Sequence, residues 1–170
     1  LRMTVYLLRH AIAEDRSASG RDRDRVLTQE GVAKLETVLR VAAKAGVKPE
    51  RILASPYQRT VQTAAVAKQV LGVAEDVMYS DAFTPEALPR AAWDDIRNWR
   101  DEEPLLVVTH EPLVSGLFSL LLGVSEYVHD FKKAGLAKLE ISRVTAQPAG
   151  TVRWILTPAL AAAVASEAGD

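Results

Sequence analysis

Two patterns of apolar and polar residues alternate along the chain. Short apolar runs of strand length, rich in β-branched and aromatic residues, occupy residues 4–8, 51–55, 77–80 and 104–110. Longer segments, in which apolar residues fall on one face of a helix, occupy residues 27–46, 57–72, 85–100 and 113–123. Two more apolar runs near the C-terminus, at 135–142 and 151–156, predict a β-hairpin. The chain is therefore expected to alternate strands and helices.

Local signals mark where several of these helices begin and end. Thr28 precedes Gln29 and Glu30 and is expected to cap the first helix, which Gly46 can end in a left-handed conformation. Gly72 provides the same stop for the second helix. Pro89 falls inside the third helical segment and is expected to interrupt it, because proline removes a helix hydrogen bond.

The alternation predicts an α/β fold, a three-layer α/β/α sandwich around a mostly parallel central sheet. A length of 170 residues fits one domain, so residues 1–170 are expected to form a single unit. The alanine-rich tail, at about 158–170, is expected to be peripheral. The predicted elements use nearly all of the chain, which leaves no large cap insertion over the sheet.

Charge and composition exclude several classes of function. The formal net charge of -1 gives no general attraction to nucleic acid or to an anionic membrane surface. The chain has no cysteine, which rules out a thiol nucleophile, a disulfide or a zinc-thiolate site. No apolar run approaches the length of a membrane span. We therefore expect a cytoplasmic protein that binds neither nucleic acid nor membrane.

Cationic and imidazole side chains stand where three predicted strands end. Arg9 and His10 follow the first strand, Arg59 lies in the first turn of the helix after the second strand, and His110 ends the fourth. Because ligands of open α/β sheets bind beyond the carboxyl ends of the strands, these four side chains are expected to share one crevice. One guanidinium group can bind two phosphate oxygens at once, and helix N-termini add backbone N–H donors. The predicted ligand is therefore a phosphate group.

A metal site fits the sequence less well. The three histidines, His10, His110 and His129, include no closely spaced ligand pair, so we expect neither a metal nor another cofactor. His129 lies in a polar segment and is interpreted as a surface residue. Glu111 directly follows His110 and can be a surface carboxylate or an acid-base group; we expect the former.

Four segments, in this order, resemble the signature segments of the histidine phosphatase superfamily, also called phosphoglycerate-mutase-like: LLRHAIAEDR, DRVLTQEGVAKL, ILASPYQRTVQTA and VVTHEPLVSGL. The short length, TPEAL and GLAKLEIS look most like the SixA-type protein phosphohistidine phosphatases. This resemblance implies the phosphoglycerate-mutase-like fold, with His10 as the nucleophile that becomes phosphorylated and with Arg9, Arg59 and His110 holding the phosphoryl group. The family usually has glycine after the histidine, where this chain has Ala11, a minor departure unless that position needs a positive φ.

A general acid is not fixed by any motif. Many members of the superfamily place a carboxylate after the third strand, where this chain offers Asp81 and Glu86. Three functions stay open: a SixA-type phosphatase acting on a phosphohistidine-bearing protein, an aryl or small-molecule phosphomonoesterase on the same scaffold, and a non-catalytic phosphate-binding module. The presence of all four core residues argues against the third.

Overall fold

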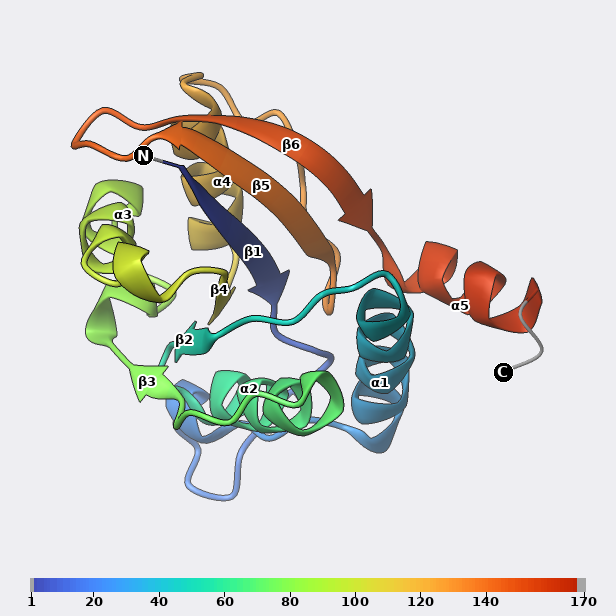
Figure 1. Ribbon diagram of the computed structural model, residues 1–170. Coiled ribbons are helices and arrows are strands. Elements are labelled where there is room, and N and C mark those ends of the chain that lie inside the picture. The colour runs from blue at the N-terminus through green and yellow to red at the C-terminus, as the bar shows by residue number, and fades with distance from the viewer. Residues whose placement is uncertain (1, 168–170) are drawn as a thin grey trace.

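The computed structural model describes residues 2–167 and shows one six-stranded sheet with helices on both faces (Figure 1). The strands are β1 (Met3–Arg9), β2 (Arg51–Ala54), β3 (Met78–Tyr79), β4 (Leu105–Thr109), β5 (Leu136–Arg143) and β6 (Ala149–Leu156), in the spatial order β3-β2-β4-β1-β5-β6. Strands β1 to β4 pair in parallel, whereas β5 pairs antiparallel with both β1 and β6. The predicted mostly parallel sheet and C-terminal hairpin are confirmed.

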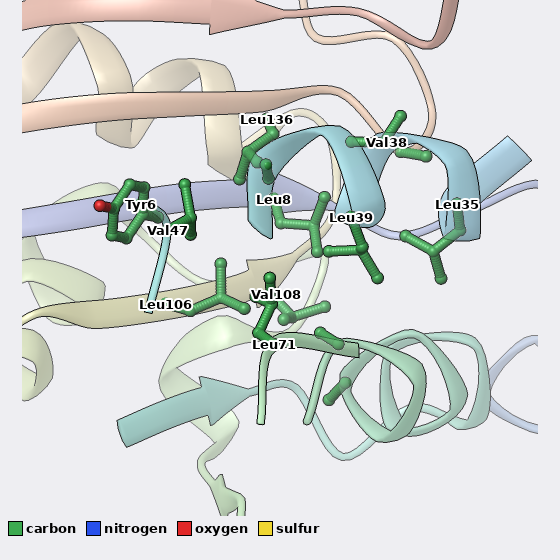
Figure 2. Packing of buried hydrophobic residues seen from close by; sticks show 14 of the residues in the cluster. Tyr6, Leu8, Leu35, Val38, Leu39, Val47, Leu71, Leu106, Val108 and Leu136 are labelled. Atoms are coloured by element: carbon green, nitrogen blue, oxygen red, sulfur yellow. The ribbon is translucent and has the colours of Figure 1, made fainter. Parts of the chain in front are cut away.

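Helices form the two outer layers of the sandwich. They are α1 (Gln29–Lys44), α2 (Gln58–Leu71), α3 (Pro89–Arg97), α4 (Leu113–Leu122) and α5 (Pro158–Glu167). One core cluster joins α1, α2 and α5 to one face of the sheet, and a second joins α3 and α4 to the other. Side chains alternate across β1, with Tyr6 and Leu8 in the first core and Val5 and Leu7 in the second. Figure 2 shows Leu8 packed beneath α1 in the first core.

Helix ends follow the predicted signals. The Thr28 side chain accepts a hydrogen bond from the Gly31 backbone N–H at 2.9 Å and caps α1. Gly46 and Gly72 have φ angles of 89° and 68°, in the left-handed region that their stop positions require.

The third helix starts later than the expected range of 85–100. It begins at Pro89, because proline is well suited to the first helical position, where its missing N–H costs nothing. Residues 85–86 form a turn and 87–88 have no regular structure, and a separate 3₁₀ turn at Arg100–Glu102 follows the helix. In the tail, α5 packs against α1 with Ala161 buried, while residues 168–170 lie outside the described part of the chain.

The sheet brings the three predicted junctions to one edge. In the register of the strands, Arg9 lies beside Thr109 and Ala54 beside Val108, so β1, β2 and β4 end level with one another. The residues that follow these strands, His10, Ser55 and His110, therefore leave the sheet side by side. Among residues 2–167, no helix is long and apolar enough to cross a membrane.

Candidate active site

His10 stands at the end of β1 and is 6% exposed. Its Nδ1 lies 2.8 Å from the backbone oxygen of Ala11. A carbonyl oxygen can only accept, so Nδ1 carries the proton and Nε2 keeps its lone pair. Ala11 is fully buried, and its φ is not positive, because Ala134 is the only non-glycine residue with positive φ in the described chain. Alanine in place of the usual glycine is thus accommodated.

The environment of His10 keeps its ring neutral. The pKa of His10 is lowered to about 3, mainly by burial and in part by the positive charges of Arg59, Arg9 and Arg25. The hydrogen bond to Ala11 opposes this shift. At neutral pH the ring therefore has an unprotonated nitrogen that can act as a nucleophile.

His110 lies against His10, with the two ring centroids 5.2 Å apart in an edge-to-face arrangement. Its Nε2 is 2.8 Å from the hydroxyl of Ser55, a buried residue whose Oγ also accepts from the Tyr57 N–H at 3.2 Å. When the Ser55 hydroxyl donates to Nε2, the proton of His110 lies on Nδ1. Burial, followed by the neighbouring His10 and Arg59, lowers the pKa of His110 to about 2.

Two arginines complete the site. Arg59, in the first turn of α2, is 4% exposed and donates to the backbone oxygen of Asp22 at 3.0 Å and to its carboxylate at 3.1 Å. Arg9 donates from Nη1 to the Phe131 oxygen at 2.7 Å. Hydrogen bonds to the protein thus fix part of each guanidinium group. Burial lowers the pKa of each arginine, but both stay charged at neutral pH.

Unpaired buried donors cluster around His10. Within residues 2–167, four buried side-chain nitrogen or oxygen atoms have no hydrogen-bond partner, and three of them are Arg9 Nε, Arg59 Nε and His110 Nδ1. Buried polar groups without partners are rare and costly. An anion bound beside His10 would satisfy donors of this kind, so the arrangement suits a phosphoryl group.

The loop before α1 contributes two residues that the sequence reasoning did not place in the site. The Asp22 carboxylate accepts hydrogen bonds from Arg59 and, at 3.0 Å, from Arg25 Nε. The positive charge of Arg25 contributes to the lowered pKa values of His10 and His110. The position of Arg25 inside the segment DRVLTQEGVAKL, which carries part of the family resemblance, is the sequence signal that could have identified it.

The two candidate general acids lie on an exposed segment. Asp81 opens the 3₁₀ turn Asp81–Phe83, and Glu86 follows in the turn before α3. The segment lies beside the end of β4, because the Thr109 hydroxyl donates to the Phe83 oxygen at 2.6 Å. Both carboxylates are on exposed residues, and neither makes a side-chain hydrogen bond or ion pair within residues 2–167. Their role as proton donors stays a prediction.

Glu111 is half-buried rather than a free surface carboxylate. It accepts from the Ser115 N–H at 3.0 Å and the Ser115 hydroxyl at 2.6 Å, and so binds the first turn of α4. It also accepts from the Phe131 N–H at 3.1 Å, and the oxygen of the same residue holds Arg9. Glu111 therefore links α4 to the turn that positions Arg9.

Replacing Glu111 with alanine is expected to lower the free energy of unfolding by about 1–3 kcal/mol, because three hydrogen bonds are lost. The same variant should bind inorganic phosphate more weakly, because Phe131, whose oxygen accepts from Arg9, loses its hydrogen bond to Glu111. Urea denaturation and phosphate titration measure the two effects. Glu126→Ala, an exposed carboxylate on the segment between α4 and this turn, is the matched control. Equal stability of the two variants would contradict the linking role.

Acid is expected to destabilise the fold through the two buried histidines. Their folded pKa values, about 3 and about 2, lie below the ordinary value of 6.5. As pH falls below about 6.5 the unfolded chain binds protons that the folded chain does not, so the free energy of unfolding falls, by up to about 1.4 kcal/mol per pH unit for each histidine. Urea unfolding at pH 7.5 and 5.0 measures this slope. His10→Asn should have a shallower slope, and an unchanged slope would refute the assignment.

At the carboxyl edge of this α/β/α sandwich, two buried neutral histidines lie with the buried Arg59 and the half-buried Arg9 in one cationic candidate site. Residues 5–83 match the family described as histidine phosphatase superfamily (branch 1). No curated protein sequence matches the chain.

Solved structures with the same fold include SixA proteins. The protein histidine phosphatase SixA, solved with tungstate, is 24% identical with a TM-score of 0.83, covering 92% of this chain and 98% of that one. The putative phosphohistidine phosphatase SixA from Agrobacterium tumefaciens is 26% identical, with a TM-score of 0.79 and the same coverage of both chains. The putative SixA from Nakamurella multipartitia is 22% identical, with a TM-score of 0.76, covering 93% and 97%. The predicted resemblance to the superfamily, and to SixA in particular, is confirmed.

Proposed function

We propose that this protein is a phosphatase that transfers a phosphoryl group to His10 and then to water, and that its substrate is phosphohistidine on a partner protein. The observation that carries the proposal is the buried, neutral His10, whose Nδ1 is bonded to Ala11 and whose Nε2 is left to react among Arg9, Arg59 and His110. The match to the histidine phosphatase superfamily and the likeness to SixA structures support phosphatase activity.

In the first step the lone pair of His10 Nε2 forms a bond to phosphorus while the bond from phosphorus to the substrate nitrogen breaks. The leaving imidazole nitrogen keeps the electron pair of the broken bond, takes a proton from solvent and departs neutral. In the second step water forms a bond to phosphorus and releases a proton to solvent. The bond to Nε2 breaks, its electron pair returns to Nε2, and phosphate leaves with His10 restored. Arg9, Arg59 and the Nδ1–H of His110 would stabilise the negative oxygens throughout, which is the main contribution of a protein to phosphoryl transfer.

The leaving group is where the substrate classes differ. An alkoxide needs a positioned proton donor, worth roughly 100 to 10,000-fold in rate. Asp81 and Glu86 are exposed, and no hydrogen bond or ion pair with residues 2–167 orients their carboxylates. The conjugate acid of imidazole has a pKa of about 6.5, so imidazole can leave without a positioned proton donor. This difference favours phosphohistidine and aryl phosphates over serine or sugar phosphates.

Release of phosphate from a panel of substrates tests the proposal. Phosphohistidine protein and aryl phosphates should be hydrolysed at least about 100-fold more efficiently than phosphoserine and sugar phosphates. Asp81→Asn and Glu86→Gln should change the rate on phosphohistidine only slightly. Added EDTA should leave the rate unchanged, because arginines rather than a metal are proposed to hold the phosphoryl group.

Two outcomes would overturn the substrate assignment. Efficient hydrolysis of an alkyl phosphate, abolished by either carboxylate substitution, would support the small-molecule phosphomonoesterase instead. Phosphate binding without turnover of any substrate would support the non-catalytic module.

A further inference from the structure

A cationic cavity shares Arg9 with the candidate active site. Its volume is about 540 Å³, and its lining consists of Arg9, Lys34, Lys132, Lys133, Ile12 and residues 157–159. These residues come from the end of β1, from α1, from the turn before β5 and from the start of α5. Among residues 2–167, no acidic side chain lines the cavity. Arg9 thus belongs both to the candidate active site and to this second surface.

The backbone holds the two neighbouring lysines rigidly beside the active site. The Ala134 N–H lies 3.1 Å from the oxygens of both Arg9 and His10, and the Arg9 N–H donates to the Gly135 oxygen at 3.1 Å. Ala134 has a φ of 63°, a costly conformation for alanine. A Cβ at Gly135 would lie 2.8 Å from the Lys132 oxygen, so only glycine fits there. The turn carrying both lysines is therefore fixed to the chain that carries the nucleophile.

Two of the four cations around the cavity have no ion-pair partner in the described part of the chain. Lys132 and Lys133 are exposed and make no ion pair within residues 2–167. Lys34 pairs with Glu30 at 3.2 Å on the exposed face of α1, and such a surface pair contributes little to stability. A protein of net charge -1 has no general excess of cations, so grouping four of them around one cavity is a local feature. Like charges repel, and a surface of this kind favours association with an anionic partner.

Two carboxylates also lie near Arg9. Burial lowers the pKa of Arg9, and the negative charges of Glu111 and Asp130 oppose this shift. Glu111 accepts from the Phe131 N–H, and the Phe131 oxygen accepts from Arg9, so the guanidinium group is fixed where the cavity and the candidate active site meet.

We propose that the cavity formed by Arg9, Lys34, Lys132 and Lys133 docks an acidic segment that flanks the phosphorylated histidine of a protein substrate. This inference rests on the proposed function and adds the chemistry of the partner. The cavity is large for a single anion, and Ile12 and Pro158 give it apolar walls that suit the side-chain stems of a peptide. With the phosphoryl group at His10, neighbouring carboxylates of the same chain would meet the lysines across Arg9.

Paired phosphohistidine peptides test the docking surface. One carries glutamate and aspartate around the phosphohistidine, and the other carries glutamine and asparagine at the same positions. The wild-type protein should hydrolyse the acidic peptide with a kcat/KM about tenfold higher, expressed mainly in KM and lost at high salt. In the double variant Lys132→Glu, Lys133→Glu the acidic peptide should lose this advantage or become the poorer substrate.

Lys48→Glu is the matched control. Lys48 is exposed and precedes β2, beside the start of β4, at the edge of the sheet opposite the site. The substitution makes the same change of −2 in net charge as the single variant Lys132→Glu, so the preference for the acidic peptide should fall in Lys132→Glu and persist in Lys48→Glu. Equal loss of preference in both variants would overturn the proposal, because net charge alone would then account for it.

Binding of the unphosphorylated acidic peptide, followed by fluorescence anisotropy, separates this inference from the proposed function. Binding that depends on Lys132 and Lys133 supports the docking surface even if no phosphohistidine is hydrolysed. Hydrolysis of both peptides with equal kcat/KM would support the proposed phosphatase activity and overturn the proposed docking surface. Competition by free glutamate at the same carboxylate concentration would also overturn it, since a simple ionic attraction would suffice.

Discussion

Replacing His10 with alanine is expected to reduce phosphate release by at least about a thousand-fold, because it removes the nitrogen that forms the covalent intermediate. No other side chain in the site can take over this role, since His110 Nε2 is engaged with Ser55. Initial rates with phosphohistidine protein and with an aryl phosphate measure the loss.

A histidine outside the site provides the control. His129 packs against Phe118 and Phe131 and has no contact with His10, so His129→Ala should retain most of the activity. Circular dichroism and urea unfolding establish whether each variant is folded. Normal turnover by a folded His10→Ala variant would refute the nucleophile assignment.

Replacing Arg59 with lysine should lower kcat/KM by about tenfold to a hundredfold. The guanidinium group of Arg59 is nearly fully buried and donates from two nitrogens to Asp22, which leaves Nε for the substrate. An ammonium group is a point charge and cannot bond Asp22 and a phosphoryl oxygen in this fixed geometry. Steady-state kinetics with an aryl phosphate measure the effect.

Arg40 provides a matched substitution outside the site. It lies on the exposed face of α1 and pairs with Glu36, so Arg40→Lys should leave kcat/KM unchanged. An equal kcat/KM for Arg59→Lys and the wild-type protein would show that only the positive charge at this position matters, and that the planar geometry of the guanidinium group does not.

Much of the architecture is predictable because the sequence signals act locally. Apolar runs and helical periods identify the strands and helices, and Thr28, Gly46 and Gly72 mark helix ends by their own backbone requirements. The convergence of Arg9, His10, Arg59 and His110 also follows from the sequence, since residues after parallel strands must gather at one edge.

Other features depend on contacts between segments that lie far apart in the chain. The ion pair between Asp22 and Arg59 joins residues 37 positions apart, and the hydrogen bond between Ser55 and His110 joins residues 55 positions apart. Glu111 reaches Phe131 across the segment after α4. Periodicity and capping rules do not encode such partners, which are set by how the loops pack over the edge of the sheet.

The most direct test of the account is to trap the phosphorylated protein. The chain is mixed with phosphohistidine protein, quenched in alkali within the first turnover and digested for mass spectrometry. The account predicts a phosphoryl group on His10 that is stable to alkali and labile to acid, and that is absent from His10→Ala. Phosphate release from the wild-type protein with no phosphoryl group ever found on His10, or with one found on another residue, would contradict it.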